Sequence, residues 1–464
     1  MTVKHEGATA VPPRPRQKVI DWNMLEQTKH VNIQKGMSMA SDNKDKAVLH
    51  YPGGEYEMDI VHATEGNDGV YLGKMLAETG LTTLDTGYMN TAPTKSDITF
   101  IDGDKGILQY RGYDIADLAN NATFNEVSYL LINGELPNDE QKEEFNSNIR
   151  KHTLLDEDFK AQFRVFPRDA HPMSVLASSL NILSTYYQDS LDPLNKDFQK
   201  LNTYRLMAKV PMLAAYAYRA SKGKPYMYPD NSLNARQNFL RQMFGYPTEP
   251  FQDDPIVTKA LDKLLILHAD HEQNCSTSTV RMVASSQANM FVSIAAGINA
   301  LSGPLHGGAN QAVLEMLEEI QANGGDATDF MKRVKNKEPG VKLMGFGHRV
   351  YKNYDPRAAI IKESAHEIID HLGGDELLDL ALKLEEIALA DDYFIERKLY
   401  PNVDFYTGLI YRAMGFPTEF FTVLFAMGRL PGWIAQYLEQ INDPAGKINR
   451  PRQIYTGPAA RKLQ

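Results

Sequence analysis

The stretch DPIVTKALDKLLILH, residues 254–268, shows the kind of element from which this protein is built. Asp254 and Pro255 are a favourable helix cap and first-turn residue. The apolar residues that follow recur every three or four positions, so they share one face of a helix: Val257, Ala260, Leu261, Leu264 and Leu265. The stretch therefore predicts an amphipathic helix over 256–268 that ends near His268.

The same periodicity continues along most of the chain. It predicts further helices over 205–220 (interrupted by Pro211), 309–320, 356–372, 375–390, 404–414 and 419–440. The clearest strand signal is the pair 98–102 and 107–111, whose Gly-Asp-Lys-Gly turn indicates a hairpin. Because strands and helices do not alternate, we predict an all-α protein with a small β-hairpin region near the N-terminus.

Composition and charge exclude several classes of protein. With 43% hydrophobic and 23% charged residues, the 464-residue chain is typical of a folded globular protein, of about two to four domains. Its net charge of −10 argues against non-specific binding to nucleic acid or to an anionic membrane surface. No apolar run approaches the ~20 residues of a membrane helix.

The N-terminal region and the cysteine content bear on location. Residues 1–46 are rich in proline and then polar, and lack the apolar core of a secretory signal, so we expect a mobile tail. Cys275 is the only cysteine, which excludes an intrachain disulfide and fits a reducing compartment. We expect a cytoplasmic protein.

Two histidine-containing stretches are unlike ordinary packing sequence. In LHADHEQN (267–274), His268 and His271 are three residues apart, not four with an intervening glutamate as in zinc proteases, so we predict no metal site. His268 continues an apolar face and is interpreted as a core histidine, whereas His271 is expected to face a ligand. His306 directly precedes the 309–320 helix, whose dipole favours a neutral imidazole able to hydrogen-bond an enolate oxygen; the alternative is an incidental histidine in a tight turn.

Arginines and one aspartate occupy the remaining unusual stretches. GFGHR (345–349) does not match a phosphate-binding fingerprint. Arg357 lies in the first turn of a helix, where the dipole disfavours a cation, so either Asp355 neutralises it or it binds a carboxylate. Asp404 begins a helix, and N-capping is its simplest role. Arginines bind carboxylates bidentately, and neutral histidines with a carboxylate base suit proton removal beside a carbonyl. The residues alone indicate a binder of a multi-carboxylate compound that performs enolate chemistry.

Six segments together resemble the citrate synthase family: LHADHEQN (267–274), GPLHGGAN (303–310), LMGFGHRVYKNYDPR (343–357), PNVDFYTG (401–408), FTVLFAMGR (421–429) and NRPRQIYTG (449–457). The YPGG start at 51–54 and the hairpin near residue 100 are similar to the bacterial branch. The resemblance implies condensation of acetyl-CoA with oxaloacetate and hydrolysis of citryl-CoA to citrate and CoA, the first step of the tricarboxylic acid cycle. It implies no cofactor.

The resemblance also implies the roles of individual residues. Asp404 would remove the methyl proton of acetyl-CoA, His306 would hydrogen-bond its carbonyl, and His348 would polarise the oxaloacetate ketone. The implied oxaloacetate or citrate contacts are His271, Arg357, Arg429, Arg450, Asn402 and Phe425. The implied CoA contacts are Leu343, Met344, Gly345, Phe346, Gly347 and Lys398, with Arg397 as an alternative to Lys398.

The family's architecture would divide the chain into domains. The resemblance implies a large domain over 47–307, with a β-containing segment at 47–113, a small domain over 308–415, and a return to the large domain over 416–464. The site would lie in the cleft, which oxaloacetate closes. Arg450 would reach the neighbouring subunit's site in a homodimer, and assembly of dimers into a hexamer is left open.

Three rival functions remain open from sequence. A 2-methylcitrate synthase would use propionyl-CoA with the same residues, and one methyl group discriminates by only about 1–3 kcal/mol. A non-enzymatic helical scaffold would need a broken set of motif residues, and none is broken. A metal hydrolase using His268 and His271 would be inhibited by chelators.

Overall fold

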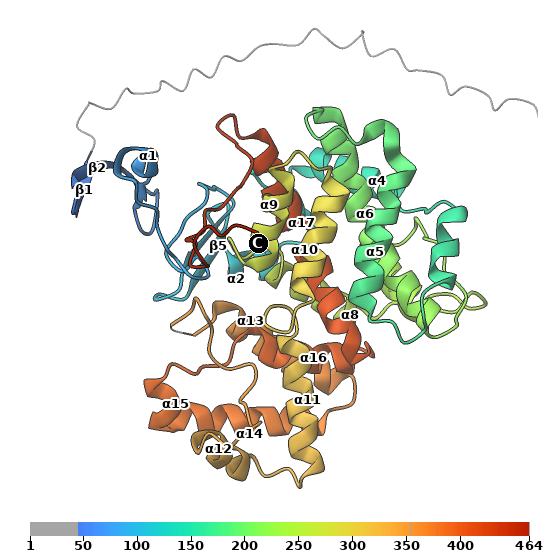
Figure 1. The fold of residues 1–464 in the computed structure, drawn as a ribbon. Helices are drawn as coiled ribbons and strands as arrows, with labels where there is room; N and C mark the ends of the chain where they lie inside the picture. The colour runs from blue at the N-terminus through green and yellow to red at the C-terminus, as the bar shows by residue number, and fades with distance from the viewer. Residues whose placement is uncertain (1–44, 353, 464) are drawn as a thin grey trace, which may run out of the picture. The chain divides into compact units, whose positions relative to one another are not determined.

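The computed structural model describes residues 45–352 and 354–463. The predicted N-terminal tail, 1–46, therefore lies almost wholly outside the described residues. The described chain forms two compact units, one made of residues 45–61 and 70–79, and one made of residues 62–69 and 80–463. Figure 1 shows the chain coloured by residue number. None of the helices described has the length and apolar character that a membrane-spanning helix requires.

The first unit contains a three-stranded sheet in the order β1-β2-β3. Its strands are β1 (Lys46–Tyr51), β2 (Gly54–Val61) and β3 (Gly69–Tyr71), and the short helix α1 (Met75–Thr79) belongs to the same unit. Strands β1 and β2 pair antiparallel from Lys46 opposite Asp59 to Tyr51 opposite Gly54. Periodicity did not reveal this sheet, because no residue of β1 or β2 is fully buried and the apolar Val48 lies on the more exposed face of β1.

The second unit begins with the predicted hairpin. Strands β4 (Thr99–Asp102) and β5 (Ile107–Tyr110) pair antiparallel with Asp102 opposite Ile107, and β6 (Tyr113–Asp114) completes the sheet. The buried Tyr110 hydroxyl lies within hydrogen-bond distance of the carbonyl oxygens of Ile266 and Asp270, at 3.2 and 3.0 Å. The hairpin is thereby tied to the segment that carries His268 and His271.

Helices form the rest of the second unit, which confirms the all-α prediction. Before the site segments these are α2 (Ile115–Asn121), α3 (Phe124–Asn133), α4 (Asp139–Lys151), α5 (Pro172–Ser184), α6 (Lys196–Ser221), α7 (Ala235–Phe244) and α8 (Pro255–Leu267). After them come α9 (Cys275–Ala284), α10 (Met290–Leu301), α11 (Ala309–Ala322), α12 (Ala327–Lys335), α13 (Pro356–His371), α14 (Glu376–Ala390), α15 (Asp392–Glu396), α16 (Val403–Ala413) and α17 (Phe421–Asn442). Helix α6 continues through Pro211, which does not interrupt it.

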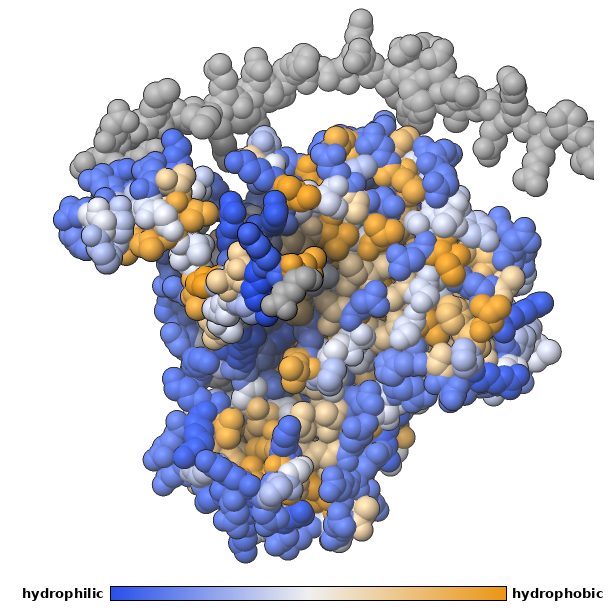
Figure 2. Space-filling view, in the orientation of Figure 1, coloured by the Kyte–Doolittle hydropathy of each residue, from blue (hydrophilic) through white to orange (hydrophobic). Residues whose placement is uncertain are grey.

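Helix α17 forms the core of this unit. Its residues are buried without interruption from Phe421 to Tyr437, and it packs against α3, α8, α9 and α10. Helix α13 packs against α8 and α16, and α16 packs against α11. In Figure 1 the helices α11, α12, α14 and α15 gather at the lower end of the view. Figure 2 shows mainly hydrophilic residues on this face, with apolar residues reaching the surface in separate places between them.

Candidate active site

His268 ends helix α8 as its C-terminal cap residue. Its Nδ1 lies 2.8 Å from the Leu264 carbonyl oxygen, so Nδ1 carries the proton, and the buried Nε2 has no hydrogen-bond partner among the described residues. Burial lowers the pKa of His268 to about 3. The expected core histidine is therefore buried and neutral, but only one of its two nitrogens is satisfied.

His306 lies in the tight connection between α10 and α11. Its Nε2 is 3.2 Å from the Ser276 backbone nitrogen and 2.9 Å from Ser276 Oγ. A backbone N–H can only donate, so Nε2 accepts and the neutral ring carries its proton on Nδ1. Burial, followed by the charge of Arg429, lowers the pKa of His306 to about 4.

The packing around His306 explains the glycine that follows it. A Cβ added to Gly307 would lie 2.4 Å from the Leu301 carbonyl oxygen, so no larger residue fits there. Ser276 is itself held in place, because its Oγ accepts a hydrogen bond from Trp433 Nε1 at 3.2 Å and lies 2.8 Å from Asn274 Oδ1. The ring of His306 is thus oriented by helices α9 and α17.

His348 follows the glycine-rich loop, and its free ring nitrogen is Nε2, whereas that of His306 is Nδ1. Its Nδ1 accepts hydrogen bonds from the backbone N–H groups of Val350 and Tyr351, at 3.0 and 3.2 Å. The neutral ring therefore carries its proton on Nε2. Burial, followed by the charge of Arg357, lowers the pKa of His348 to about 4.

Tyr351 joins His348 to His271. The rings of His271 and His348 are 5.4 Å apart, and the Tyr351 ring is 4.8 Å from that of His348. The Tyr351 hydroxyl lies 3.2 Å from His271 Nε2. Burial holds the pKa of His271 well below its ordinary value. Sequence reasoning gave Tyr351 no role, although it belongs to the GHRVY motif, because a buried aromatic residue is by default read as core.

Two buried arginines flank these histidines. Arg357 is 3% exposed, and Asp355 binds its Nε and Nη2 at 3.0 and 2.9 Å. Asp355 does neutralise Arg357, as one of the two sequence alternatives expected. Arg429 is 1% exposed; its Nε donates to the His268 carbonyl oxygen at 2.6 Å, while its Nη1 has no partner among the described residues. A buried guanidinium with a free donor favours an anionic acceptor such as a carboxylate.

Asp404 occupies the second helical position of α16. The cap of this helix is Asn402, whose Oδ1 accepts the Asp404 N–H at 3.0 Å, so the capping role considered for Asp404 is wrong. Loss of hydration raises the pKa of Asp404 to about 6; Arg357 and Arg429 oppose this effect and Asp355 reinforces it. Such a carboxylate is a stronger base than an ordinary one and is still mostly ionised at neutral pH.

The loop at 343–347 is fixed to the start of α16. Asn402 donates from Nδ2 to the Gly347 carbonyl oxygen at 2.8 Å and from its backbone N–H to the Gly345 carbonyl oxygen at 2.9 Å. Gly345 has φ +76°, and a Cβ there would lie 2.6 Å from Val313 Cγ2. Phe346 is buried against Phe405 at 4.6 Å between ring centroids. Asn402 and Phe346 therefore have structural uses that the sequence did not reveal.

The remaining sequence candidates differ in exposure. Phe425 is buried and lies 4.7 Å from the His268 ring, 6.3 Å from the His306 ring and 5.0 Å from the Arg429 guanidinium. Leu343 and Met344 are half-buried. Lys398 and Arg450 are exposed, the latter on the segment that follows α17.

The arginines bring the acid–base groups into one electrostatic environment. The charge of Arg357 lowers the pKa of His271, His348 and Asp404, and the charge of Arg429 does the same for His271, His306 and Asp404. Within residues 45–352 and 354–463, no three histidine, cysteine, aspartate or glutamate side chains gather as a metal-binding group. The arrangement provides a carboxylate base, two neutral imidazole donors and two buried cations.

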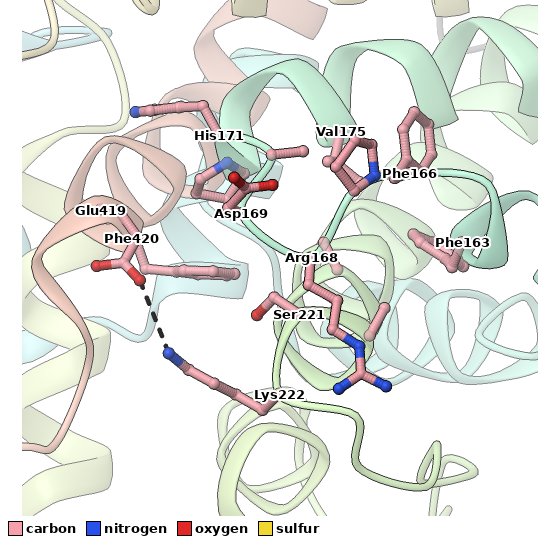
Figure 3. A pocket seen from close by; sticks show the side chains of 15 residues that line it. Phe163, Phe166, Arg168, Asp169, His171, Val175, Ser221, Lys222, Glu419 and Phe420 are labelled. Atoms are coloured by element: carbon pink, nitrogen blue, oxygen red, sulfur yellow. Dashed lines mark ion pairs between the residues drawn. The ribbon is translucent and has the colours of Figure 1, made fainter.

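A separate cavity of about 390 Å³ lies away from these residues. It is lined by the end of α6, the start of α5 and the 163–171 segment, with Lys222 and Glu419 3.9 Å apart at its edge (Figure 3). It shares no residue with the histidine and arginine cluster.

Comparisons with known proteins point to one family. A family model described as "Citrate synthase, C-terminal domain" matches residues 87–452. The chain is 78% identical over 426 residues to a citrate synthase of Corynebacterium glutamicum, covering 92% of this chain and 97% of that protein. It is 65% identical over 418 residues to citrate synthase 1 of Mycobacterium tuberculosis, covering 90% and 97%.

Solved structures agree with the sequence comparisons. Citrate synthase from Pyrobaculum aerophilum matches with a TM-score of 0.75 and 35% identity, over 94% of this chain and 98% of that one. A ternary complex of citrate synthase from Thermoplasma acidophilum with carboxymethyl coenzyme A and oxaloacetate matches with a TM-score of 0.74 and 30% identity, over 82% and 98%.

Proposed function

The chain belongs to the citrate synthase family, and from this premise we propose which of its residues carry out the reaction. The reaction is the condensation of acetyl-CoA with oxaloacetate, followed by hydrolysis of citryl-CoA to citrate and CoA, the first step of the tricarboxylic acid cycle. The chain is thus an acyltransferase of the citrate (Si)-synthase type. Its substrates are acetyl-CoA and oxaloacetate, and the chemistry requires no cofactor.

Asp404 removes a methyl proton from acetyl-CoA in this proposal. The enol that forms is unfavourable in water, so it needs a hydrogen-bond donor at the thioester oxygen, where negative charge develops. His306 supplies that donor through Nδ1–H, because Ser276 occupies its Nε2. His348 donates from Nε2–H to the ketone oxygen of oxaloacetate, because its Nδ1 is occupied by two backbone N–H groups.

The buried cations bind the two carboxylates of oxaloacetate. Arg429 offers the free Nη1, and Arg357 offers the nitrogen that Asp355 leaves unbound. His271 and Phe425 complete the oxaloacetate pocket, and Arg450 reaches it from the partner subunit of a homodimer. The backbone of Leu343, Met344, Gly345, Phe346 and Gly347 receives the adenine end of CoA, with Lys398 near its phosphates.

The fixed tautomers of the two imidazoles are the observation that carries the proposal. Each ring accepts backbone N–H bonds on one nitrogen and has a pKa near 4, so each remains a neutral donor on the other nitrogen at neutral pH. One donor faces each of the two carbonyl groups that the condensation must activate.

Domain organisation and location extend the proposal. Residues 308–415 act as a small domain that closes over the site once oxaloacetate has bound, against the large domain formed by 47–307 and 416–464. Closure assembles the three catalytic groups around bound substrate and excludes water. The single cysteine is consistent with a cytoplasmic location.

Release of free thiol from acetyl-CoA, with and without oxaloacetate, tests the proposal. We expect release only with oxaloacetate, and at least ~10³-fold less from Asp404→Ala at unchanged helicity. Replacing acetyl-CoA with propionyl-CoA decides the 2-methylcitrate alternative. Faster turnover with propionyl-CoA would assign that reaction to the site, and activity of Asp404→Ala within about tenfold of wild type (~1.4 kcal/mol) would remove Asp404 from the catalytic role.

A further inference from the structure

Asp355 binds two helix starts that are far apart in the sequence. Its side chain is 2% exposed. Oδ1 accepts from the backbone N–H and the Nε of Arg357, both at 3.0 Å, and Oδ2 accepts from Arg357 Nη2 at 2.9 Å and from the Val403 N–H at 3.2 Å. One carboxylate therefore joins the first turn of α13 to the first turn of α16.

The two helix starts carry the two halves of the proposed chemistry. Arg357, in α13, is the proposed oxaloacetate ligand. Val403 immediately precedes Asp404, the proposed base, and its N–H is one of the groups at the start of α16 that no partner within the helix can satisfy. The other neighbouring N–H, that of Asp404, is satisfied by Asn402. Position and direction of the Asp404 side chain therefore depend on Asp355 as well as on Asn402.

We propose that Asp355 is a positioning residue that holds the oxaloacetate-binding arginine and the catalytic base in one fixed geometry. The inference rests on the proposed function and adds a residue that the family comparison did not assign. Asp355 touches neither substrate; it acts through Arg357 and through the Val403 N–H. Stabilisation of the fold does not by itself explain the buried ion pair of Asp355 and Arg357, because the desolvation of both charges offsets their attraction.

The charge of Asp355 also reaches the base. The charged and titratable groups that act on Asp404 or are acted on by it are Arg357, Arg429, Asp355 and Tyr411. The two arginines lower the pKa of Asp404 and Asp355 raises it, although burial is the largest cause of its shift. Removing the charge of Asp355 while keeping both arginines should therefore lower the pKa of Asp404.

Asp355→Asn and Asp355→Glu test the inference against a matched control. In Asp355→Asn an amide NH₂ would face two donors, Arg357 Nη2 and the Val403 N–H, so geometry and charge are both lost. Asp355→Glu keeps the charge but moves the carboxylate by one methylene. The control is Asp375→Asn, another aspartate cap, which accepts the Leu377 N–H at the start of α14. Its charged neighbour, Arg412 at 3.7 Å, lies in the last turn of α16, at the opposite end of that helix from Asp404.

We expect Asp355→Asn to raise the oxaloacetate KM and to lower kcat, each by about tenfold or more, with the acetyl-CoA KM within about threefold of wild type. The acidic limb of its profile of kcat/KM against pH should move to lower pH. Asp355→Glu should show the same losses with the limb unmoved, and Asp375→Asn should keep wild-type kinetics. If Asp355→Asn does not fold, the KM and kcat of Asp355→Glu decide.

Wild-type KM, kcat and pH profile in both Asp355 variants, with only a lower melting temperature, would reduce Asp355 to a structural role and overturn the inference. Asp404→Ala, measured in parallel, separates this failure from a failure of the proposed function. If Asp404→Ala stays active, the proposed base is wrong. If Asp404→Ala is inactive and the Asp355 variants are normal, only the positioning role is wrong.

Discussion

The starts of α13 and α16 differ from the starts of α8 and α14 at the second helical position. All four helices have an Asn or Asp cap: Asp355, Asn402, Asp254 and Asp375. In α8 and α14 the second position is apolar, Ile256 and Leu377; their caps satisfy backbone donors and also contact the end of another helix, His371 in α13 and Arg412 in α16. In α13 and α16 it is charged, Arg357 and Asp404.

Charge at that position is not needed to begin a helix. An arginine there is disfavoured by the helix dipole, and the aspartate in α16 loses hydration without any ion pair. The two helices nevertheless begin and end as the periodicity predicts. A local preference that Arg357 violates, at a helix start that one buried carboxylate joins to the start of α16, is typical of a functional site.

Asp404→Ala tests this contrast most severely. Loss of the base should reduce kcat by about 10³-fold or more, because Asp355, the other carboxylate beside Arg357, is already held by that arginine. Circular dichroism should be unchanged, since Asn402 still caps α16. Leu377→Ala at the equivalent position of α14 is the control and should keep full kcat; a comparable loss there would mean that the position matters only for folding.

Arg450→Ala tests whether one chain supplies all the residues of its active site. We expect about a 10²-fold loss of activity, because one arginine ligand of oxaloacetate is missing. Co-expression with Asp404→Ala under a second tag should restore activity, since a mixed dimer contains one site with both residues intact. If half of the dimers are mixed, recovery should approach about a quarter of wild type. Mixed dimers that remain inactive would place Arg450 outside the shared site.

Arg357→Lys sharpens the contrast between charge and geometry in α13. Lysine keeps a cation beside Asp355 but loses the planar fork that binds two acceptors at once. The oxaloacetate KM should rise by about tenfold or more while the acetyl-CoA KM stays nearly constant. Arg412→Lys is the control, because Arg412 pairs with Glu318 at 3.3 Å at the other end of α16. Equal KM changes in both variants would contradict the assignment of Arg357.

The pH dependence separates the base from the imidazoles. The pKa of Asp404 is raised to about 6, whereas those of His306 and His348 are lowered to about 4. As pH falls, the base is therefore protonated before either imidazole becomes charged. We expect kcat/KM to fall about tenfold per pH unit below pH 6 and to show a second decline near pH 4, because kcat/KM reports the pKa values of the free enzyme. A kcat/KM that is constant from pH 7 to 5 would contradict the raised pKa of Asp404.

Sequence predicted the helices better than the contacts between side chains, and the roles it assigned to the site residues stay predictions. The 3.6-residue period shows α8, α11 and α13 because each buries one face, whereas α16 is buried almost throughout. It does not show β1 and β2, because none of their residues is fully buried and the apolar Val48 lies on the more exposed face of β1. Tyr351 and Ser276 escaped notice because their importance comes from partners 80 and 30 residues away, His271 and His306. Which ring nitrogen of His306 or His348 is free also depends on backbone donors, that of Ser276 for His306 and those of Val350 and Tyr351 for His348. No residue pattern encodes this choice.

Asp254→Ala has the smallest expected effect and tests a helix start whose role is structural. Asp254 caps α8 and accepts from the N–H groups of Ile256 and Val257, at 3.0 and 3.3 Å. Loss of the cap should lower the free energy of unfolding by about 1 kcal/mol and leave kcat and both KM values unchanged.

Partial burial alone would raise the pKa of Asp254, but His371 and the two N–H groups hold it below its ordinary value. A group with a lowered folded-state pKa stabilises the fold above its unfolded-state pKa and loses that effect as pH falls through the folded-state value. Denaturant unfolding should therefore show that Asp254→Ala lowers the free energy of unfolding less at pH 3 than at pH 7. A change in the oxaloacetate KM would contradict the purely structural role of this cap.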